Sequence, residues 1–271
     1  MRKYPYLVAG LPNLLPEQAE PPLSVAAYIA LLRAHLAPED MAQLALLLLP
    51  ADHRNLLQLL RGQAEGGHPW AWWSEAELRE RMADGQGLPP YFYTFAEAFR
   101  EAGEGAPAPA DPYWDDRLAA EGYRYALAGA GGFVAAWLPF ERDLRNLIAA
   151  LNARWRQLDP GPKLVDGAAL AEALTLRPQA RDFGLSADYF FLTELLEAYD
   201  LPNLLERERA IDLLRWRHAE ALNAFSYFTA DVLMGYLVRL QLLERWAKLH
   251  PERGAEVLRR LIDQPQMQAQ P

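Results

Sequence analysis

Apolar residues recur at intervals of three and four through almost the whole chain, and this spacing constrains the fold more than any other feature. Val25, Tyr28, Ile29 and Leu32 form one such face directly after Ser24, a residue type that caps helices. Alternation of the kind that strands show is missing over neighbouring segments, which argues against a parallel sheet with helical crossovers. The sequence therefore predicts an all-α protein.

Prolines and capping residues divide this pattern into separate helices. Pro38 suits the first turn of a helix that we expect Pro50 to end, so that Asp52 opens a short second helix. Ser74 and Glu77 form an S-x-x-E capping box. We expect Pro139 to kink or divide a long helical stretch. Later helices are expected at 166–175, 186–199, 204–223, 229–249 and 251–262.

The distribution of proline and small residues predicts helical bundle lobes after a short extended N-terminal arm, in which YLVAGLP has the composition of one short strand. EGAPAPADP is the clearest linker. The length also fits three pseudo-repeated lobes that form a funnel. The expected divisions are an arm at 1–23, lobe 1 at 24–103, a linker at 104–112, lobe 2 at 113–184, lobe 3 at 185–263 and a flexible tail at 264–271.

Composition excludes several classes of function. The 271 residues include no cysteine, so disulfides, thiolate zinc sites and cysteine nucleophiles are impossible. The formal charge of −9 repels a phosphate backbone and argues against a nucleic-acid partner. The N-terminus lacks the long apolar segment of a signal peptide, and the apolar run at 44–50 is far shorter than the roughly 20 residues that span a bilayer. We therefore expect a soluble protein with no direct membrane insertion.

One nine-residue element occurs twice, as DHRNLLQLL at 52–60 and as DLRNLIAAL at 143–151. Its shared polar residues are Asp52, Arg54 and Asn55 in the first copy and Asp143, Arg145 and Asn146 in the second. If each aspartate begins a helix, aspartate and asparagine can cap it reciprocally. If the helix runs through, the asparagine needs a buried or interhelical partner. A capped helix packed on the core, a duplicated helical unit and a catalytic signature remain the three interpretations.

Motifs associated with catalysis occur without the context that their chemistry needs. DFG at 182–184 lacks the other kinase motifs, and we interpret it as a loop. AGAGGF at 128–133 lacks the lysine and the preceding strand of a phosphate-binding loop. The five histidines show no metal-binding spacing, and adjacent acidic residues look like solvated helix faces. We therefore predict no catalytic, cofactor-binding or metal-binding residues.

Three tryptophans are concentrated in HPWAWW, at the end of the polar, glycine-bearing loop at 63–73. Trp70, Trp72 and Trp73 either fold back as a lid on the first lobe or contact a partner, because loops lie at surfaces and exposed tryptophans favour interfaces. Both interpretations remain open at this point, and the three residues are candidate partner contacts.

Several longer segments resemble a bacterial family of unknown function whose genes lie among those of a V-type (A/V-type) ATPase. These segments are YPYLVAGLPNL at the start, LPPYF at 88–92, YWDDRLAAEGYRYA at 113–126, ARDFGLS at 180–186 and the helical stretch at 206–249. The resemblance covers nearly the full length, and the motifs are specific to that family.

A more distant resemblance is to the C/d subunit of V-type ATPases. The pattern D-x-x-N-L-L-x-L-L-R-G at 52–62, which includes Arg61, is similar to a helical motif of that subunit. YFTADVLMGYLVRLQLLERW at 227–246 resembles its last-lobe helix, in which the pattern leads to Glu244. The resemblance implies a funnel of three helical lobes that caps the membrane rotor ring and receives the central axle. The chain is shorter than that subunit, and its arm and linker differ from it.

The function that these resemblances imply is a non-catalytic central-stalk (rotor) subunit of a V-type ATPase or ATP synthase. It would link the axle to the membrane rotor ring for proton or sodium transport, without a cofactor, and would be cytoplasmic and peripheral to the inner face of the cell membrane. A helical adaptor or assembly factor of the same ATPase is the alternative. A small helical enzyme with convergent carboxylates is the third interpretation.

Overall fold

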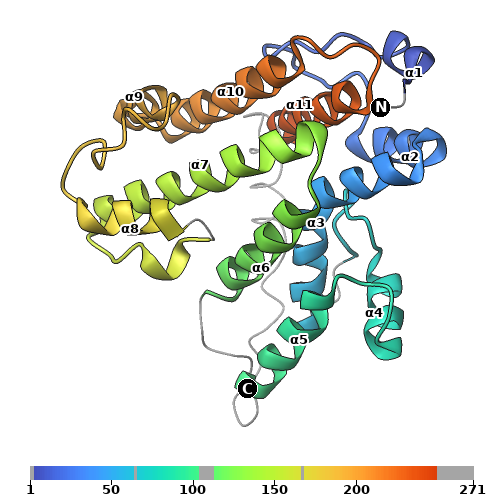
Figure 1. Ribbon diagram of the computed structural model, residues 1–271, viewed down its shortest axis with the longest axis horizontal. Coiled ribbons are helices and arrows are strands. Elements are labelled where there is room, and N and C mark those ends of the chain that lie inside the picture. Colours follow the sequence, from blue (N-terminus) through green and yellow to red (C-terminus); the bar gives the residue numbers. More distant parts are fainter. Residues whose placement is uncertain (1–2, 64–65, 104–112, 166–167, 249–271) are drawn as a thin grey trace, which may run out of the picture.

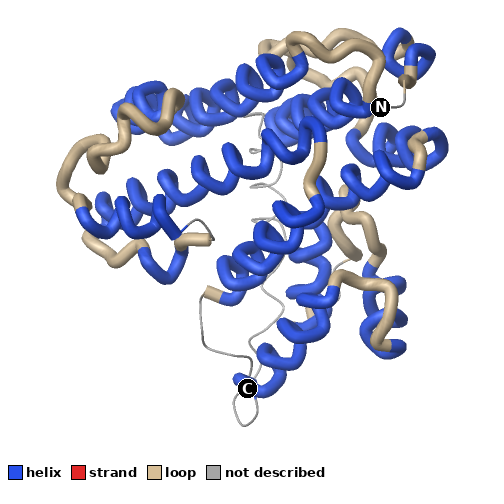
Figure 2. Tube along the Cα trace, viewed as in Figure 1, coloured by secondary structure: helices blue, strands red, loops and turns tan. Residues whose placement is uncertain are grey.

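The computed structural model describes residues 3–63, 66–103, 113–165 and 168–248, and every regular element among them is a helix (Figure 2). The one strand-type pairing within these ranges is a single antiparallel bridge between Lys3 and Thr229. The prediction of an all-α protein is confirmed.

The helices vary from one short turn to twenty-five residues. In chain order they are α1 Pro5–Ala9, α2 Val25–His35, α3 Pro38–Leu60, α4 Glu75–Asp84, α5 Pro90–Gly103, α6 Trp114–Gly129, α7 Gly132–Arg156, the 3-10 helix η1 Gly161–Lys163, α8 Ala168–Leu176, α9 Leu192–Asp200, α10 Leu204–Asn223 and α11 Ala230–Lys248.

The long helices α3 and α7 organise the packing. α3 contacts α4, α5 and α6, whereas α7 contacts α8, α10 and α11. α6 lies between the two sets, because it packs against both α3 and α7. Figure 1 shows α7 and α10 side by side, with α3, α5 and α6 extending away from them. Dense contact between long helices produces a stiff body.

The first part of the chain is closed by the last described helix. α2 packs on α11, and the fully buried ring of Tyr28 lies 5.0 Å from that of Tyr236. One hydrophobic core includes residues from Tyr4 to Leu243. The three-lobe funnel stays a prediction. The linker at 104–112, the helix at 251–262 and the tail at 264–271 lie outside the described residues.

The prediction that Pro50 ends a helix was wrong, because Pro50 lies inside α3. Pro139 lies inside α7 and does not divide it, and a kink at Pro139 stays a prediction. The buried face of α3 continues on both sides of Pro50, with Leu48 before it and Leu56 after it. Burying one leucine contributes about 1.5–3 kcal/mol, so the leucines together outweigh the roughly 3 kcal/mol that an interior proline costs.

Two segment boundaries also differ from the prediction. The N-terminal arm is not wholly extended, because α1 occupies part of it. The helix expected at 186 begins at Leu192. The residues before it form turns in which Phe183 is buried with a φ of 54°, and the Asp182 carboxylate accepts the Gly184 N–H at 3.0 Å. The DFG sequence therefore belongs to a loop, as predicted.

Candidate functional site

Asp52 lies in the middle of α3 and is fully buried. It holds residues 68–73, which we call the tryptophan loop. Its Oδ1 accepts the backbone N–H groups of Trp72 at 2.7 Å and Trp73 at 3.1 Å. The predicted role of Asp52 as a helix N-cap is therefore wrong, because α3 continues through it. The same side chain satisfies two backbone donors that lie 20 and 21 residues further along the chain.

Asn55 holds that loop at a second place, one turn further along α3. Its Oδ1 accepts the His68 N–H at 2.6 Å, and its Nδ2 donates to the Trp73 carbonyl at 3.2 Å. A Cβ at Gly67 would lie 3.1 Å from Nδ2, so the loop backbone passes very close to the amide. One side chain thus fixes both ends of the segment 68–73.

Asn146, the equivalent residue of the second copy, also holds a loop by hydrogen bonds to its backbone. It is fully buried in α7, and its Nδ2 donates to the Val165 carbonyl at 2.7 Å while its Oδ1 accepts the Val165 N–H at 2.8 Å. Each copy of the element therefore sends an asparagine from the middle of a long helix to clamp the loop that follows. This agrees with the interpretation that required a buried partner for the asparagine.

The aspartates of the two copies differ. Asp143 accepts a hydrogen bond from its neighbour Arg142 at 2.8 Å, whereas Asp52 holds a loop. Burial raises the pKa of Asp52 to about 7, although the Trp73 and Trp72 N–H groups and the Arg33 charge lower it. Its second oxygen, Oδ2, is buried and has no hydrogen-bond partner among the described residues.

Two arginines connect the end of α3 and the second copy to the first turn of α6. Arg61 pairs with Asp115 at 2.9 Å, and Arg145 pairs with Asp116 at 2.6 Å. Arg54 instead contacts His68, with 3.0 Å between Nη1 and Nε2. The adjacent carboxylates of Asp115 and Asp116 thus pair with one arginine directly after α3 and with one arginine of α7, and so connect these two helices through the start of α6.

The three tryptophans are seated on the body of the molecule. Each is half-buried and packed against the core. The Arg33 guanidinium lies over the Trp72 ring, 4.1 Å from its centroid, and also donates to the Trp72 carbonyl. Trp73 meets Phe92 edge to face at 5.9 Å. This is the arrangement of a segment folded back on the first helices; whether it also contacts a partner stays a prediction.

Glu244 connects this loop to two further helices. Its Oε1 accepts the Trp70 indole N–H at 3.3 Å, and its Oε2 accepts the Val25 N–H at the start of α2 at 2.6 Å. Burial raises the pKa of Glu244, but hydrogen bonds from Lys248 and Val25 outweigh it and lower that pKa below its ordinary value. A charged carboxylate from α11 thus caps α2 and holds the tryptophan loop.

A cavity of about 220 Å³ lies between α3, α6 and α7, and the arginines of both copies, Arg54 and Arg145, line it. His53 lines it as well, and its Nε2 lies 2.6 Å from the Tyr91 hydroxyl. Burial, and then the charge of Arg145, lowers the pKa of His53 to about 3. The histidine is therefore neutral at physiological pH and is a core residue with a satisfied nitrogen.

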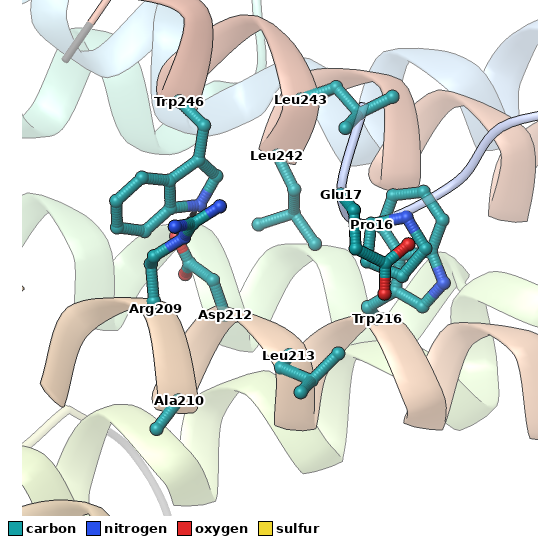
Figure 3. Close-up of a pocket in the computed structure, with 10 residues that line it drawn as sticks. All are labelled: Pro16, Glu17, Arg209, Ala210, Asp212, Leu213, Trp216, Leu242, Leu243 and Trp246. Carbon is teal, nitrogen blue, oxygen red and sulfur yellow. Dashed lines mark hydrogen bonds between the residues drawn. The ribbon is translucent and has the colours of Figure 1, made fainter. Parts of the chain in front are cut away.

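A second, open groove of about 330 Å³ runs between α10 and α11. Figure 3 shows Arg209 beside Trp246 on one side of it and Glu17 near Trp216 on the other, with leucines between them. Asp212 also lines the groove, and burial raises its pKa against the lowering effect of Arg215 and Arg245.

Both oxygens of Asp212 are occupied. Arg215 and Arg245 each donate to Oδ1 at 2.9 Å, and the Trp246 indole N–H donates to Oδ2 at 3.0 Å. Arg215 also makes a bidentate pair with Glu141 of α7. This network fastens α10, α11 and α7 together, so the carboxylate acts as a structural tie.

Sequence reasoning located the motif residues but missed their contacts, since nothing local marks the loop that each asparagine holds. It also missed an exposed aromatic surface at the start of the chain and between α10 and α11, which includes Tyr6 and Phe225. The available signal was that residues 4–16 and 221–230 contain no charged side chain. Within the described ranges, no group of three or more His, Asp or Glu side chains is placed to hold a metal ion.

These observations define an all-α protein in which paired polar clamps fix loops onto two long central helices. The chain belongs to the family described as protein of unknown function (DUF2764), whose model matches residues 1–269. Neither the curated proteins nor the solved structures gave a match. In the described part of the chain, no helix is both long and apolar enough to cross a bilayer.

Proposed function

We propose that this protein is a non-catalytic central-stalk subunit of a V-type ATPase, similar to the C/d subunit, that links the axle to the membrane rotor ring. The proposal starts from the sequence resemblance at 52–62 and 227–246. It includes a cytoplasmic location at the inner face of the membrane, and it requires neither a cofactor nor a reaction at this chain.

The observation that carries the proposal is the equivalent use of Asn55 and Asn146. Each clamps a loop from the same position of a repeated element. Because the two asparagines occupy the same position of the element and both hold a loop, a duplicated helical unit is favoured over a chance similarity. Repeated units are what a funnel built from similar lobes would need.

The buried charges also favour a mechanical role. Asp212 and Arg215 connect α10 to α11 and α7, and Glu244 connects α11 to α2. A subunit that transmits torque needs a body whose helices do not slide, and buried, fully hydrogen-bonded networks supply that rigidity. The enzyme interpretation needs an accessible carboxylate with a raised pKa, and Asp212 in the α10–α11 groove is committed to its arginines.

A stoichiometric pull-down from the native cell tests the proposal. The tagged full chain is recovered from gently solubilised membranes, and the copies of each co-purifying protein are counted. We expect ring and axle subunits with one copy of this chain. Recovery only from assembling complexes would establish the adaptor instead. Absence of every ATPase subunit would contradict both the rotor subunit and the adaptor. The enzyme interpretation, with a site in the Asp212 groove, would then be the one to test.

A further inference from the structure

Four aromatic side chains are exposed to solvent at one end of the molecule. Tyr6 is 93% exposed, Phe225 92%, Tyr227 69% and Phe228 42%. Tyr6 belongs to α1, and the other three lie in the connection between α10 and α11. Figure 1 shows α1 and this connection at the same end, beside the N-terminus. We call these four residues the aromatic tip.

The two segments of the aromatic tip are joined through their backbones. The Tyr4 N–H donates to the Phe228 carbonyl at 2.5 Å, and Lys3 forms an antiparallel bridge with Thr229. Tyr6 is therefore brought to the same end of the molecule as Phe225, Tyr227 and Phe228, which come far later in the sequence. Isolated exposed apolar side chains are ordinary, but a group of them at one place marks an interaction site.

The backbone that carries the aromatic tip is held in place at Tyr4 and Phe228. Tyr4 is buried, and its hydroxyl donates to Asp40 at 2.5 Å and accepts the Ala37 N–H at 3.0 Å. Phe228 has a φ of 58°, a left-handed conformation that costs a non-glycine residue free energy. Residues fixed in this way lose little further freedom on binding, which favours affinity.

The tip is also free of charge in a strongly acidic protein. Residues 4–16 and 221–230 contain no acidic or basic side chain, whereas the whole chain carries −9. The centres of protein interfaces are depleted in charge and enriched in tyrosine and phenylalanine. The composition of the tip matches such a centre.

Three kinds of surface could cover these rings: an anionic bilayer, a second copy of the chain and an uncharged protein surface. Their charges differ, and this difference decides between them. An anionic lipid surface attracts basic clusters, and Lys3 is the one basic residue described at the tip, so a bilayer offers little attraction to a chain of −9. A second copy brings another −9 and repels the first. An uncharged, apolar protein surface has neither disadvantage.

We propose that the aromatic tip docks on an uncharged apolar protein surface, and that this surface is the exposed end of the membrane rotor ring. The second clause rests on the proposed function. Tyrosine and phenylalanine have apolar rings, and tyrosine adds a polar hydroxyl, so these residues suit a protein surface that borders the headgroup zone of a bilayer.

Binding of the full chain to the purified membrane ring in nanodiscs tests this. The variant Phe225→Ser/Tyr227→Ser removes two rings of the tip. The matched control, Trp155→Ser/Phe190→Ser, removes two rings that are 81% and 76% exposed outside the tip. We expect the tip variant to bind about tenfold or more weakly, the control to stay within about twofold of wild type, and both to keep the wild-type circular dichroism spectrum.

Equal ring binding by the wild type and the tip variant would overturn the proposal. Binding of the wild type to empty nanodiscs would replace the ring by lipid, and a dimer that only the tip variant loses would replace it by a second copy. If the tip variant still co-purifies with the ATPase in the pull-down and binds the ring, the tip proposal fails while the proposed function stands. A wild type that neither co-purifies nor binds the ring contradicts both.

Discussion

A carboxamide side chain carries a donor and an acceptor on two separate atoms, and Asn146 uses both on the backbone of one residue, Val165. It does so without a charge. Asn55 uses the same two groups to bridge His68 and Trp73. In both places the alternative is a loop backbone with unpaired polar groups against the core.

We expect Asn146→Ala to lower the free energy of unfolding by about 2–4 kcal/mol, because it leaves two buried backbone groups unpaired. Asn55→Ala should cost less, about 1–3 kcal/mol, since its loop is partly exposed. Urea denaturation followed by circular dichroism measures both. Asn13→Ala, at an exposed position, is the control and should change stability by less than about 0.5 kcal/mol. Equal effects at all three positions would contradict the clamp interpretation.

Asp52 predicts a pH dependence of stability. Its pKa in the folded protein is about 7, against 3.8 for the unperturbed group, so between these values the folded state holds a proton that the unfolded state has lost. The stabilising contribution is therefore complete below pH 4 and disappears as the pH rises through 7. The difference between the two pKa values corresponds to roughly 4 kcal/mol at most.

The measurement is the free energy of unfolding of wild type and Asp52→Asn between pH 5 and pH 8. Asparagine keeps an oxygen for the Trp72 and Trp73 N–H groups but cannot ionise, so the part of the slope that belongs to residue 52 should vanish. Asp84→Asn, at an exposed position, should retain the wild-type slope. A slope that survives in Asp52→Asn would assign the pH dependence to other groups.

At the scale of the element, local signals predicted the helices well where they acted alone. The Ser74–Glu77 capping box forms, and α10 and α11 begin and end within a residue of the predicted bounds. The prediction that a helix ends at Pro50 was wrong, because the leucines on both sides of Pro50 are buried together. Propensity is local, whereas burial is decided by helices that no single segment contains.

The clamps could be predicted only in part for the same reason. The sequence indicates that a mid-helix asparagine needs a partner, but a partner thirteen or nineteen residues away leaves no periodic trace. The position of the tryptophan loop depends on hydrogen bonds to Asp52 and Glu244, which lie in different helices. Nothing in HPWAWW itself shows that the rings fold inward.

Glu244 gives a prediction about helix connection. Removing its carboxylate in Glu244→Ala takes away the acceptor of the Val25 N–H, which should cost about 1 kcal/mol as the loss of a helix cap does. Combined with Trp70→Phe, which removes the indole N–H, the two changes should show a coupling of about 0.5 kcal/mol or more. A double-mutant cycle by urea denaturation measures it. Glu197→Ala, on an exposed face of α9, should show no coupling with Trp70→Phe.

At the scale of the whole molecule, the described helices share one core rather than forming independent units. α2 belongs to the predicted first lobe but is covered by α11 of the predicted third. The Tyr28 hydroxyl donates to the Leu233 carbonyl at 3.1 Å, and both groups are buried. The all-α class was predictable from spacing alone, but this closure was not, since it joins residues about two hundred positions apart.

We expect the fragment 1–103 not to fold cooperatively by itself. It would expose the face of α2 that α11 covers and leave the Tyr28 hydroxyl without its buried partner. Near-ultraviolet circular dichroism and urea denaturation of the fragment, beside the full chain, measure this. A sharp unfolding transition of the fragment would show that the first lobe is an autonomous domain.

The carboxylate that caps α2 is translated 219 residues after the helix start that it serves. A ribosome making this chain from its N-terminus therefore releases α2 and the tryptophan loop long before Glu244 exists. Until α11 emerges, the Val25 N–H and the Trp70 indole N–H lack the Glu244 carboxylate, and the face of α2 that α11 covers is exposed. Transiently exposed apolar surface of this kind is what chaperones bind. The synthesis of α11 is thus also the step that completes the first part of the fold.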